Sequence, residues 1–207
     1  MKKKRYHDWF SEITLGVLLI ILALCVIYLC FPTAFADGTE DVNYMQIMID
    51  SVVNRDYETG QWAESMRNNK IINNNLNYIL VDYDELDLLS RLIQEEAGSD
   101  GISQEWRMDV GEVVIHRIAS SEFPNTLHDV IFQRGQYYPV ISGSIYSSVP
   151  RRECVEAALA VLEGRDDMPD TVVFQANFSQ GSVYRTYYLY PYGTTYFGES
   201  YNKHLYN

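Results

Sequence analysis

The stretch "DELDLLSRLIQEEAGSDG", residues 84–101, predicts an amphipathic helix that begins at Asp84 and stops at Gly98. Aspartate is a favoured N-cap residue, and glycine commonly ends a helix. The apolar residues recur at the i, i+3, i+4, i+7 spacing of a helix with one buried face. They are Leu86, Leu89, Ile93 and Ala97, with Leu88 and Leu92 beside them. We therefore expect this helix to pack one face into the core of a domain.

Glu96 departs from this pattern because it lies seven residues after Leu89. At roughly 100° per residue, its side chain is only about 20° from that of Leu89 around the helix axis. A carboxyl group withdrawn from water has a raised pKa, and a group that keeps its proton near neutral pH can protonate a glycosidic oxygen. Glu95, one residue earlier, is rotated by about 100° toward solvent. The alternative is that the last helical turn frays and that Glu96 is solvated.

The chain has 207 residues, 47% of them hydrophobic and 21% charged, which suits one globular domain with additional segments. A basic N-terminus precedes an uncharged apolar run, Ile13–Cys30, that is long enough to span most of a hydrocarbon core of about 30 Å. The basic residues predict a cytoplasmic N-terminus and an exported remainder. The "AFA" of residues 34–36 fits a signal-peptidase site. Residues 1–36 are thus either a cleaved signal peptide or a membrane anchor, and the protein is expected to be secreted or membrane-anchored.

Charge and cysteine content exclude several classes of function. Without residues 1–36, which hold four basic and two acidic residues, the net charge is −14. Nucleic acids and anionic membrane surfaces select basic patches, so neither is an expected partner of the exported part. Cys154 is the one cysteine outside the apolar run, which excludes a disulfide framework or a thiolate metal cluster there. No cofactor is expected.

Residues 37–83 are polar and rich in asparagine, and they are predicted to be a spacer with a helix around residues 43–53. Two further helices are expected at residues 105–120 and 151–164. Between them, residues 123–140 should form a turn, a short helix and an extended stretch. Residues 171–177 and 184–198 have β-rich patterns, with a turn near Pro191–Gly193. Helices followed by short strands indicate an α+β domain over residues 84–207.

Residues 87–206 resemble the cell wall hydrolase family of spore cortex-lytic enzymes (SleB-type). "DLLSRLIQEEAGSD" is similar to the family's "LLARLIxAEARGE", in which Glu96 falls on the catalytic glutamate. "VGEVVIHRIASSEFPNTLHDVIFQRGQYYPV" is similar to "VAAVVLNRVxSPxFPNTIxxVIxQPGQFSPV", "VVFQAN" to "xYFYNP", and "KHLY" to "NHxFY". The resemblance implies a compact lysozyme-like catalytic domain that binds the glycan strands of peptidoglycan. It implies cleavage between N-acetylmuramic acid and N-acetylglucosamine.

The resemblance also implies substrate-binding roles for four residues. They are Gln136, Asn177, His204 and Tyr206. An ordinary polar turn is the alternative for Gln136, and a structural role is the alternative for the C-terminal pair. The tyrosines late in the chain suit stacking on sugar rings, although packing in half-buried strands is their commoner use.

The sequence departs from the family in four places. It has no acid directly after the "EEAG" segment, where Asp100 can take that position, and it has extra residues before the second helix. The family's Asn-Arg is His116–Arg117 here, and its Tyr-Asn-Pro is replaced by residues 175–177, Gln-Ala-Asn. These departures concern substrate positioning and leave Glu96 and the Gly-Gln segment in place.

The family works as lytic transglycosylases, in which one glutamate acts first as an acid and then as a base. Glycoside hydrolysis normally needs two carboxylates. Because Asp100, Asp109 and Glu112 are candidates for the second one, a muramidase-like glycosidase stays open.

Other classes of protein are less consistent with the sequence. A Cys/His peptidase would use Cys154, which lies in an apolar helical stripe typical of a buried, inert thiol. A metal hydrolase is disfavoured because the histidines are dispersed and no HExxH spacing occurs. A non-catalytic, membrane-tethered module that binds peptidoglycan also stays open.

Overall fold

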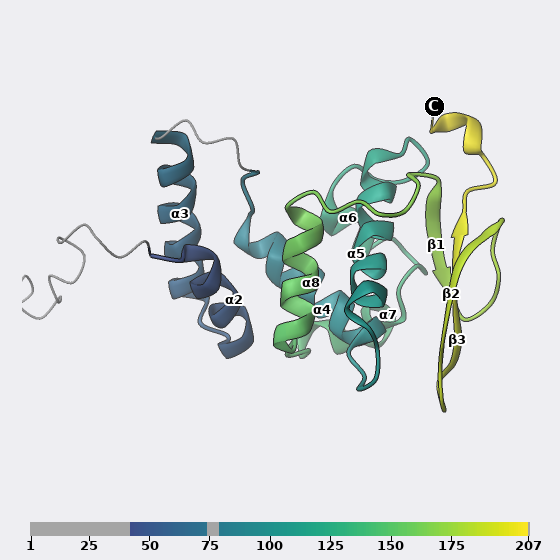
Figure 1. The fold of residues 1–207 in the computed structure, drawn as a ribbon, viewed down its shortest axis with the longest axis horizontal. Coiled ribbons are helices and arrows are strands. Elements are labelled where there is room, and N and C mark those ends of the chain that lie inside the picture. Colours follow the sequence, from purple (N-terminus) through teal and green to yellow (C-terminus); the bar gives the residue numbers. More distant parts are fainter. Residues whose placement is uncertain (1–41, 74–78, 207) are drawn as a thin grey trace, which may run out of the picture. The chain divides into compact units, whose positions relative to one another are not determined.

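Helices come first along the chain and strands last, as Figure 1 shows for this computed structural model. The structure describes residues 42–73 and 79–206, and one compact unit comprises residues 43–207. Its elements are α2 (Tyr44–Asn54), α3 (Tyr57–Asn73), α4 (Tyr83–Ala97), α5 (Gln104–Ala119), α6 (Leu127–Ile131), α7 (Tyr138–Ser142), α8 (Arg152–Leu162), β1 (Val172–Ala176), β2 (Val183–Leu189) and β3 (Gly193–Glu199). Two 3₁₀ turns, η2 (Ser144–Tyr146) and η3 (Lys203–Leu205), complete them. The predicted α+β class is confirmed.

The apolar run Ile13–Cys30 and the "AFA" segment lie outside the described residues. Within residues 42–73 and 79–206, none of the helices combines the length and the apolar character that crossing a membrane requires.

Helix α4 has the predicted buried face and ends at the predicted Gly98. Its start differs from the prediction, because the N-cap is Asp82, whose side chain accepts a hydrogen bond from the Glu85 N–H at 3.0 Å. Tyr83 is 2% exposed, so the helix begins early enough to place this ring in the core. Asp84 lies in the first turn, where an acidic side chain interacts favourably with the helix dipole.

Helices α5 and α8 pack against α4 and against each other, as both sequence patterns predict. Gly111 of α5 lies where the three helices are in close contact. A Cβ atom at Gly111 would lie 3.2 Å from Cγ2 of Val161 on α8 and 3.4 Å from Cδ1 of Ile93 on α4. The missing side chain therefore lets three helices meet around one core, which is the frame that fixes the end of α4.

The segment predicted to be a polar spacer differs from that expectation. Its described residues form α2, which covers the helix expected there, and α3. Met48 and Val52 of α2 are almost fully buried in the same core as α4, and Arg67 of α3 forms an ion pair with Glu163. The reason is the apolar stripe of α2, which can be buried only against a neighbour.

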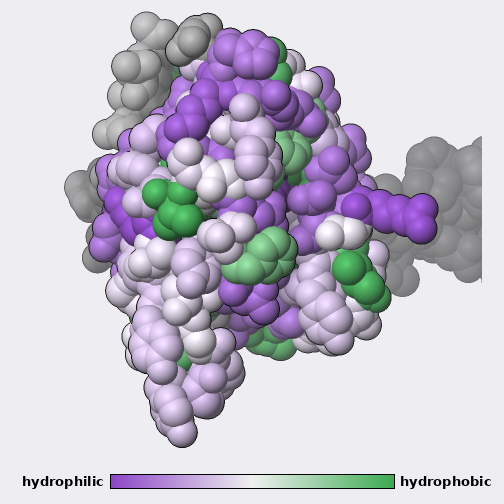
Figure 2. All heavy atoms as spheres, turned by 90° about the vertical axis from the view of Figure 1, so that its right-hand side faces the viewer, coloured by the Kyte–Doolittle hydropathy of each residue, from purple (hydrophilic) through white to green (hydrophobic). Residues whose placement is uncertain are grey.

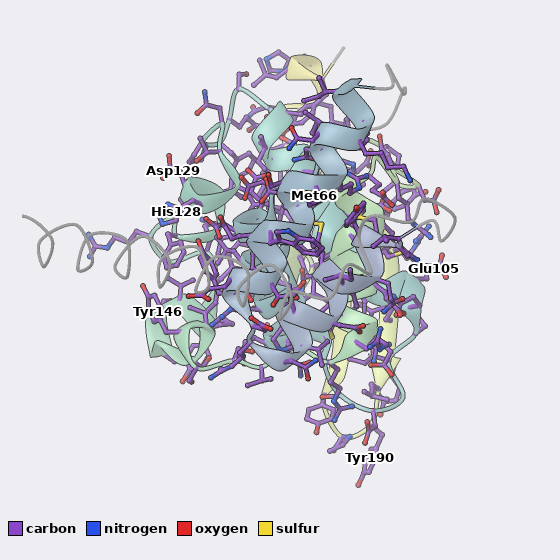
Figure 3. The ribbon with its side chains drawn as sticks, turned by 90° about the vertical axis from the view of Figure 1, so that its left-hand side faces the viewer. Met66, Glu105, His128, Asp129, Tyr146 and Tyr190 are labelled. Carbon is purple, nitrogen blue, oxygen red and sulfur yellow. The ribbon has the colours of Figure 1, made fainter. Side chains whose placement is uncertain are left out.

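The three strands form an antiparallel sheet in the order β1-β3-β2, and β1 packs against α5. Gln175 of β1 pairs with Phe197 of β3, which is fully buried, so both side chains project from the inner face of the sheet. The predicted turn connects β2 and β3, and Tyr190 lies at the tip of this hairpin (Figure 3). The extended stretch predicted at the end of residues 123–140 is helical from Tyr138 onward, where α7 begins, because Pro139 fits the first turn of a helix.

Candidate active site

The last turn of α4 is connected to three different parts of the domain by consecutive residues. The Gln94 side-chain carbonyl accepts a hydrogen bond from the N–H of Arg151, the residue before α8, at 2.9 Å. The Ser144 hydroxyl of η2 donates to the Glu95 carboxylate at 2.6 Å. Glu96 faces β1. Because successive side chains differ by about 100° around a helix, three adjacent residues reach three elements. These contacts fix the direction in which the Glu96 carboxyl group points.

Glu96 is half-buried, and burial raises the pKa of its carboxyl group to about 7. The negative charge of Glu95 raises this pKa further, whereas Arg117 lowers it. Glu96 also lies in the last turn of α4, where the negative end of the helix dipole disfavours a negative charge on its carboxyl group. The carboxyl group therefore holds a proton close to neutral pH and can give it to a bound group.

Gln175 contacts this carboxyl group from β1. Its Nε2 lies 3.4 Å from Oε2 of Glu96 in donor geometry. Its other amide atom, Oε1, is buried and has no hydrogen-bond partner among the described residues. The inner-face position of Gln175 follows from its register with Phe197.

Arg117 and Tyr137 form the buried side of the site. The Arg117 guanidinium donates to the Val173 carbonyl at 2.7 Å and to the Tyr137 hydroxyl at 3.1 Å. It also lies over the rings of Phe123 and Tyr137, 5.1 and 5.3 Å from their centroids. Burial raises the pKa of Tyr137, and the nearby Glu96 raises it further. The cation is thus held by other groups and lowers the Glu96 pKa without forming an ion pair that would deprotonate it.

The three candidates for a second carboxylate all have other partners. Asp100 is exposed and pairs with Arg151. Asp109 is fully buried and accepts hydrogen bonds from the Arg185 guanidinium at 2.8 and 2.9 Å and from the Tyr187 hydroxyl at 2.9 Å. Glu112 is also buried, and one of its oxygens accepts the N–H groups of Asp167 and Met168 at 3.1 and 3.0 Å. Asp109 and Glu112 therefore anchor the hairpin and the segment before β1.

One group of side chains among the described residues has the spacing of a metal site: Glu112, His116 and Asp166. Existing contacts account for it. His116 has one ring nitrogen 2.9 Å from the Val172 carbonyl and the other 2.9 Å from the Asp166 carboxylate, while Arg165 approaches Glu112 at 3.3 Å. These bonds tie the segment between α8 and β1 to α5.

Gln136 and Asn177, two of the predicted substrate-binding residues, are exposed close in sequence to the site. Gln136 lies in a turn directly before Tyr137, and Asn177 follows β1 two residues after Gln175. No side-chain hydrogen bond joins either of them to Glu96 in the described part of the chain. Their predicted roles stay predictions. The residues that lie near Glu96 are Tyr137, which follows Gln136, and Gln175, which precedes Asn177 by two residues.

His204 and Tyr206 lie in a different cluster. The Tyr206 hydroxyl donates to the Glu122 carboxylate at 2.7 Å and accepts a hydrogen bond from the Ser120 hydroxyl at 2.8 Å. His204 is exposed. Burial opposes a low pKa at Glu122, but hydrogen bonds from Ser200, Asn202 and Tyr206 lower it, and nearby His204 adds a smaller effect in the same direction. The structure therefore connects both residues to the end of α5, and their predicted contact with the glycan stays untested.

Cys154 is a buried free thiol on α8. Burial raises its pKa, so the thiol is protonated and a poor nucleophile. Its hydrogen bond, at 3.4 Å, goes to the Gln94 side chain. This environment argues against the Cys/His peptidase.

From the sequence, Arg117 and Gln175 have no assigned role and Tyr137 is only one of the tyrosines suited to stacking on sugars, although all three lie near Glu96. A signal for Gln175 was its spacing of two from Val173, which places both side chains on one face of a strand. A signal for Arg117 was its match to the arginine of the family's Asn-Arg pair.

The family model described as Cell Wall Hydrolase matches residues 103–198 of this chain. This match confirms the resemblance to cell wall hydrolases, and it covers the part of the domain that follows Glu96. Two solved structures are similar to this chain. The catalytic domain of the germination-specific lytic transglycosylase SleB from Bacillus anthracis is 21% identical over 57% of this chain and 97% of that one, with a TM-score of 0.48. The catalytic domain of the Bacillus cereus SleB protein is 22% identical over 57% and 91%, with a TM-score of 0.45. No curated protein matches the chain.

Proposed function

We propose that this chain, whose residues 103–198 match the cell wall hydrolase family, cleaves the glycan strands of peptidoglycan with Glu96 as the general acid. The observation that carries the proposal is the half-buried Glu96 carboxyl group, whose pKa is raised to about 7. A general acid is most effective when its pKa is near the working pH, because it is then protonated and still a good donor. The bond to be cut is the one between N-acetylmuramic acid and N-acetylglucosamine.

The surface around the sheet suits a polar polymer. Figure 2 shows the side of the molecule that carries the sheet, and the strongly hydrophobic described residues lie on it as separate spots within a hydrophilic surface. Exposed tyrosines lie along β2 and at the hairpin tip, among them Tyr188 and Tyr190. Tyrosine combines an apolar ring with a hydroxyl group, which fits the apolar faces and hydroxyls of sugars.

The proposed mechanism uses one carboxyl group twice. Glu96 gives its proton to the glycosidic oxygen while the bond from that oxygen to C1 of the muramic acid breaks. The Glu96 carboxylate then takes the proton of the C6 hydroxyl while the C6 oxygen bonds to C1, which closes a 1,6-anhydro ring. No water is consumed, and Glu96 ends protonated. This mechanism with a single carboxyl group is supported by the contacts of Asp100, Asp109 and Glu112, each of which is bound to another group of the protein.

Mass spectrometry of peptidoglycan digested by the full-length chain tests this proposal. We expect anhydro-muramic ends from the wild type and no soluble products from Glu96→Gln. Glu156→Gln, on the exposed side of α8, removes the same charge and should leave the products unchanged. Reducing ends without anhydro sugars would instead establish hydrolysis with a second carboxylate. Binding to cell walls with no product from the wild type would establish a non-catalytic module.

We also propose that the protein acts outside the cytoplasm, where peptidoglycan lies. The proposal rests on residues 1–36, which predict export. Cell fractionation followed by N-terminal sequencing would distinguish a cleaved chain from an anchored one, and a full-length chain in the cytoplasm would overturn the proposal.

A further inference from the structure

Among the hydrogen bonds of the described residues, the one to the Glu96 carboxyl group comes from the side chain of Gln175. It reaches this position because β1 packs against α5 and the pairing with Phe197 turns the side chain inward. The bond is long, 3.4 Å, and the second amide atom is buried without a partner. A buried acceptor with no donor is uncommon in a folded protein, so this atom calls for a physical reason.

We propose that Gln175 is the positioning residue of Glu96. Before substrate binds, the Gln175 Oε1 accepts a hydrogen bond from the O–H of the protonated Glu96, and its Nε2 donates to the Glu96 carboxylate after the proton has left. The inference rests on the proposed function, in which Glu96 cycles between these two forms.

The chemistry of the amide supports this role. A protonated carboxyl group needs an acceptor for its O–H, whereas a carboxylate needs donors. The side-chain amide of Gln175 carries both, with Nε2 facing Glu96 and Oε1 unpartnered beside it. A half-turn about the Cγ–Cδ bond exchanges the two atoms and presents Oε1 to the acid. Neither protonation state of Glu96 then lacks a partner.

The other charged or titratable groups near Glu96 are less suited to this role. Glu95 offers only acceptors and is held by Ser144. Arg117 offers only donors, which are used by the Val173 carbonyl and the Tyr137 hydroxyl. The Tyr137 hydroxyl can donate and accept, but its hydrogen bond is the one from Arg117, and none joins it to Glu96 among the described residues.

The resemblance to the cell wall hydrolase family suggests an informative replacement for Gln175. Gln175 aligns with the tyrosine of the family's "FYNP" segment. A tyrosine hydroxyl, like a carboxamide, both donates and accepts. The two residues differ in shape but share the one property that the proposal requires.

The experiment compares Gln175→Tyr, Gln175→Leu, Gln175→Glu and Gln175→Lys in the full-length chain. kcat and KM are measured on peptidoglycan across pH, and the Glu96 carboxyl group is titrated by ¹³C NMR, with its signal identified by its loss in Glu96→Gln. We expect Gln175→Leu to lower kcat about tenfold or more at unchanged KM, whereas Gln175→Tyr retains most of the activity. Gln175→Glu should raise the pKa of Glu96, and Gln175→Lys should lower it.

The controls separate two kinds of failure. Gln61→Leu, on α3, makes the same chemical change away from the site and should leave kcat unchanged, and thermal unfolding checks that each variant folds. If Gln175→Leu keeps wild-type kcat and the wild-type Glu96 titration, the inference is overturned. The same holds if Gln175→Tyr loses as much activity as Gln175→Leu. If the Glu96 titration responds to these variants but the wild type cleaves no glycan, the proposed function fails while the contact with Gln175 stands.

Discussion

The proton of Glu96 depends on a balance between groups from different elements. Withdrawal from water, the charge of Glu95 and the negative end of α4 all favour the protonated form, and Arg117 opposes them. Arg117 is buried and committed to other acceptors, so its influence acts through space. The resulting pKa near 7 leaves a large fraction of Glu96 protonated at neutral pH. The sequence pattern predicted that Glu95 is solvated, unlike Glu96. Its negative charge nevertheless raises the pKa of Glu96 and so affects the proposed acid.

Replacing Glu95 with glutamine should shift the alkaline limb of the pH profile of kcat/KM to lower pH. The substitution removes a negative charge that raises the Glu96 pKa, so the acid loses its proton earlier as the pH increases. The acid is active only when protonated, and activity at pH 8 should therefore fall relative to activity at pH 6. Glu156→Gln serves as the control for a charge change elsewhere. An alkaline limb that does not move, or that moves upward, would contradict this electrostatic role.

Among the elements, the β2–β3 hairpin is fixed to α5 by polar contacts and stacking together. Asp109 of α5 accepts hydrogen bonds from Arg185 and Tyr187 of β2, and Glu105 pairs with the same arginine at 3.1 Å. The ring of Tyr187 stacks on Trp106 with centroids 4.9 Å apart. Through β3, this attachment also holds β1 and its inward-facing side chains in register. The hairpin is thus part of the frame that places Gln175 against Glu96.

Asp109→Asn should destabilise the domain without removing the chemistry. Arg185 would lose its buried counter-charge, and breaking one partner of a partly buried ion pair costs about 3 kcal/mol in the free energy of unfolding. Urea denaturation measures this loss, and kcat is compared at a temperature at which both proteins are folded. We expect kcat to stay within about threefold, because the role of Asp109 is to anchor the hairpin. Unchanged stability with an abolished kcat would identify Asp109 as a second catalytic carboxylate.

The C-terminal segment is fastened to the end of α5 by Glu122. This carboxylate accepts hydrogen bonds from Tyr206, Ser200 and Asn202, which together lower its pKa although burial opposes them. Tyr206→Phe removes a hydroxyl with two hydrogen bonds, and we expect a loss of about 1–2 kcal/mol in the free energy of unfolding. If Tyr206 acts only as an anchor, KM for peptidoglycan should not change. A large increase in KM at unchanged stability would favour the substrate-binding role predicted from the sequence.

For the molecule as a whole, the sequence predicted the elements that have a strong periodic pattern. Helices α4, α5 and α8 and the hairpin around Pro191–Gly193 are present as predicted, because their hydrophobic spacing determines which face is buried. Helix α7 was missed because a proline in a polar segment fits both a helix start and an extended stretch. The prediction of a spacer over residues 37–83 did not include the packing of α2. That packing depends on contacts with α4 and α8, which follow α2 in the chain.

The site was less predictable than the fold. The spacing around α4 identified Glu96 as a residue with a raised pKa, which is a property of one helix and its face. Gln175, Arg117 and Tyr137 come from separate segments, and their contacts depend on how β1 packs against α5. Local patterns do not contain that information. The roles in substrate binding that the resemblance implies for Gln136, Asn177, His204 and Tyr206 stay predictions.

The most direct test of the central claim compares the free energy of unfolding of the wild type and Glu96→Gln by urea denaturation at pH 4 and pH 8. Folding raises the pKa of Glu96 from 4.5 to about 7, so above pH 4.5 the folded state retains a proton that the unfolded state releases. The contribution of Glu96 to wild-type stability should therefore fall as the pH rises from 4.5 to 7, whereas glutamine mimics the neutral acid at every pH. The account predicts equal stabilities at pH 4 and a glutamine variant more stable by about 3 kcal/mol at pH 8. A difference between the two proteins that is the same at both pH values would contradict it, because Glu96 would then be an ordinary ionised carboxylate.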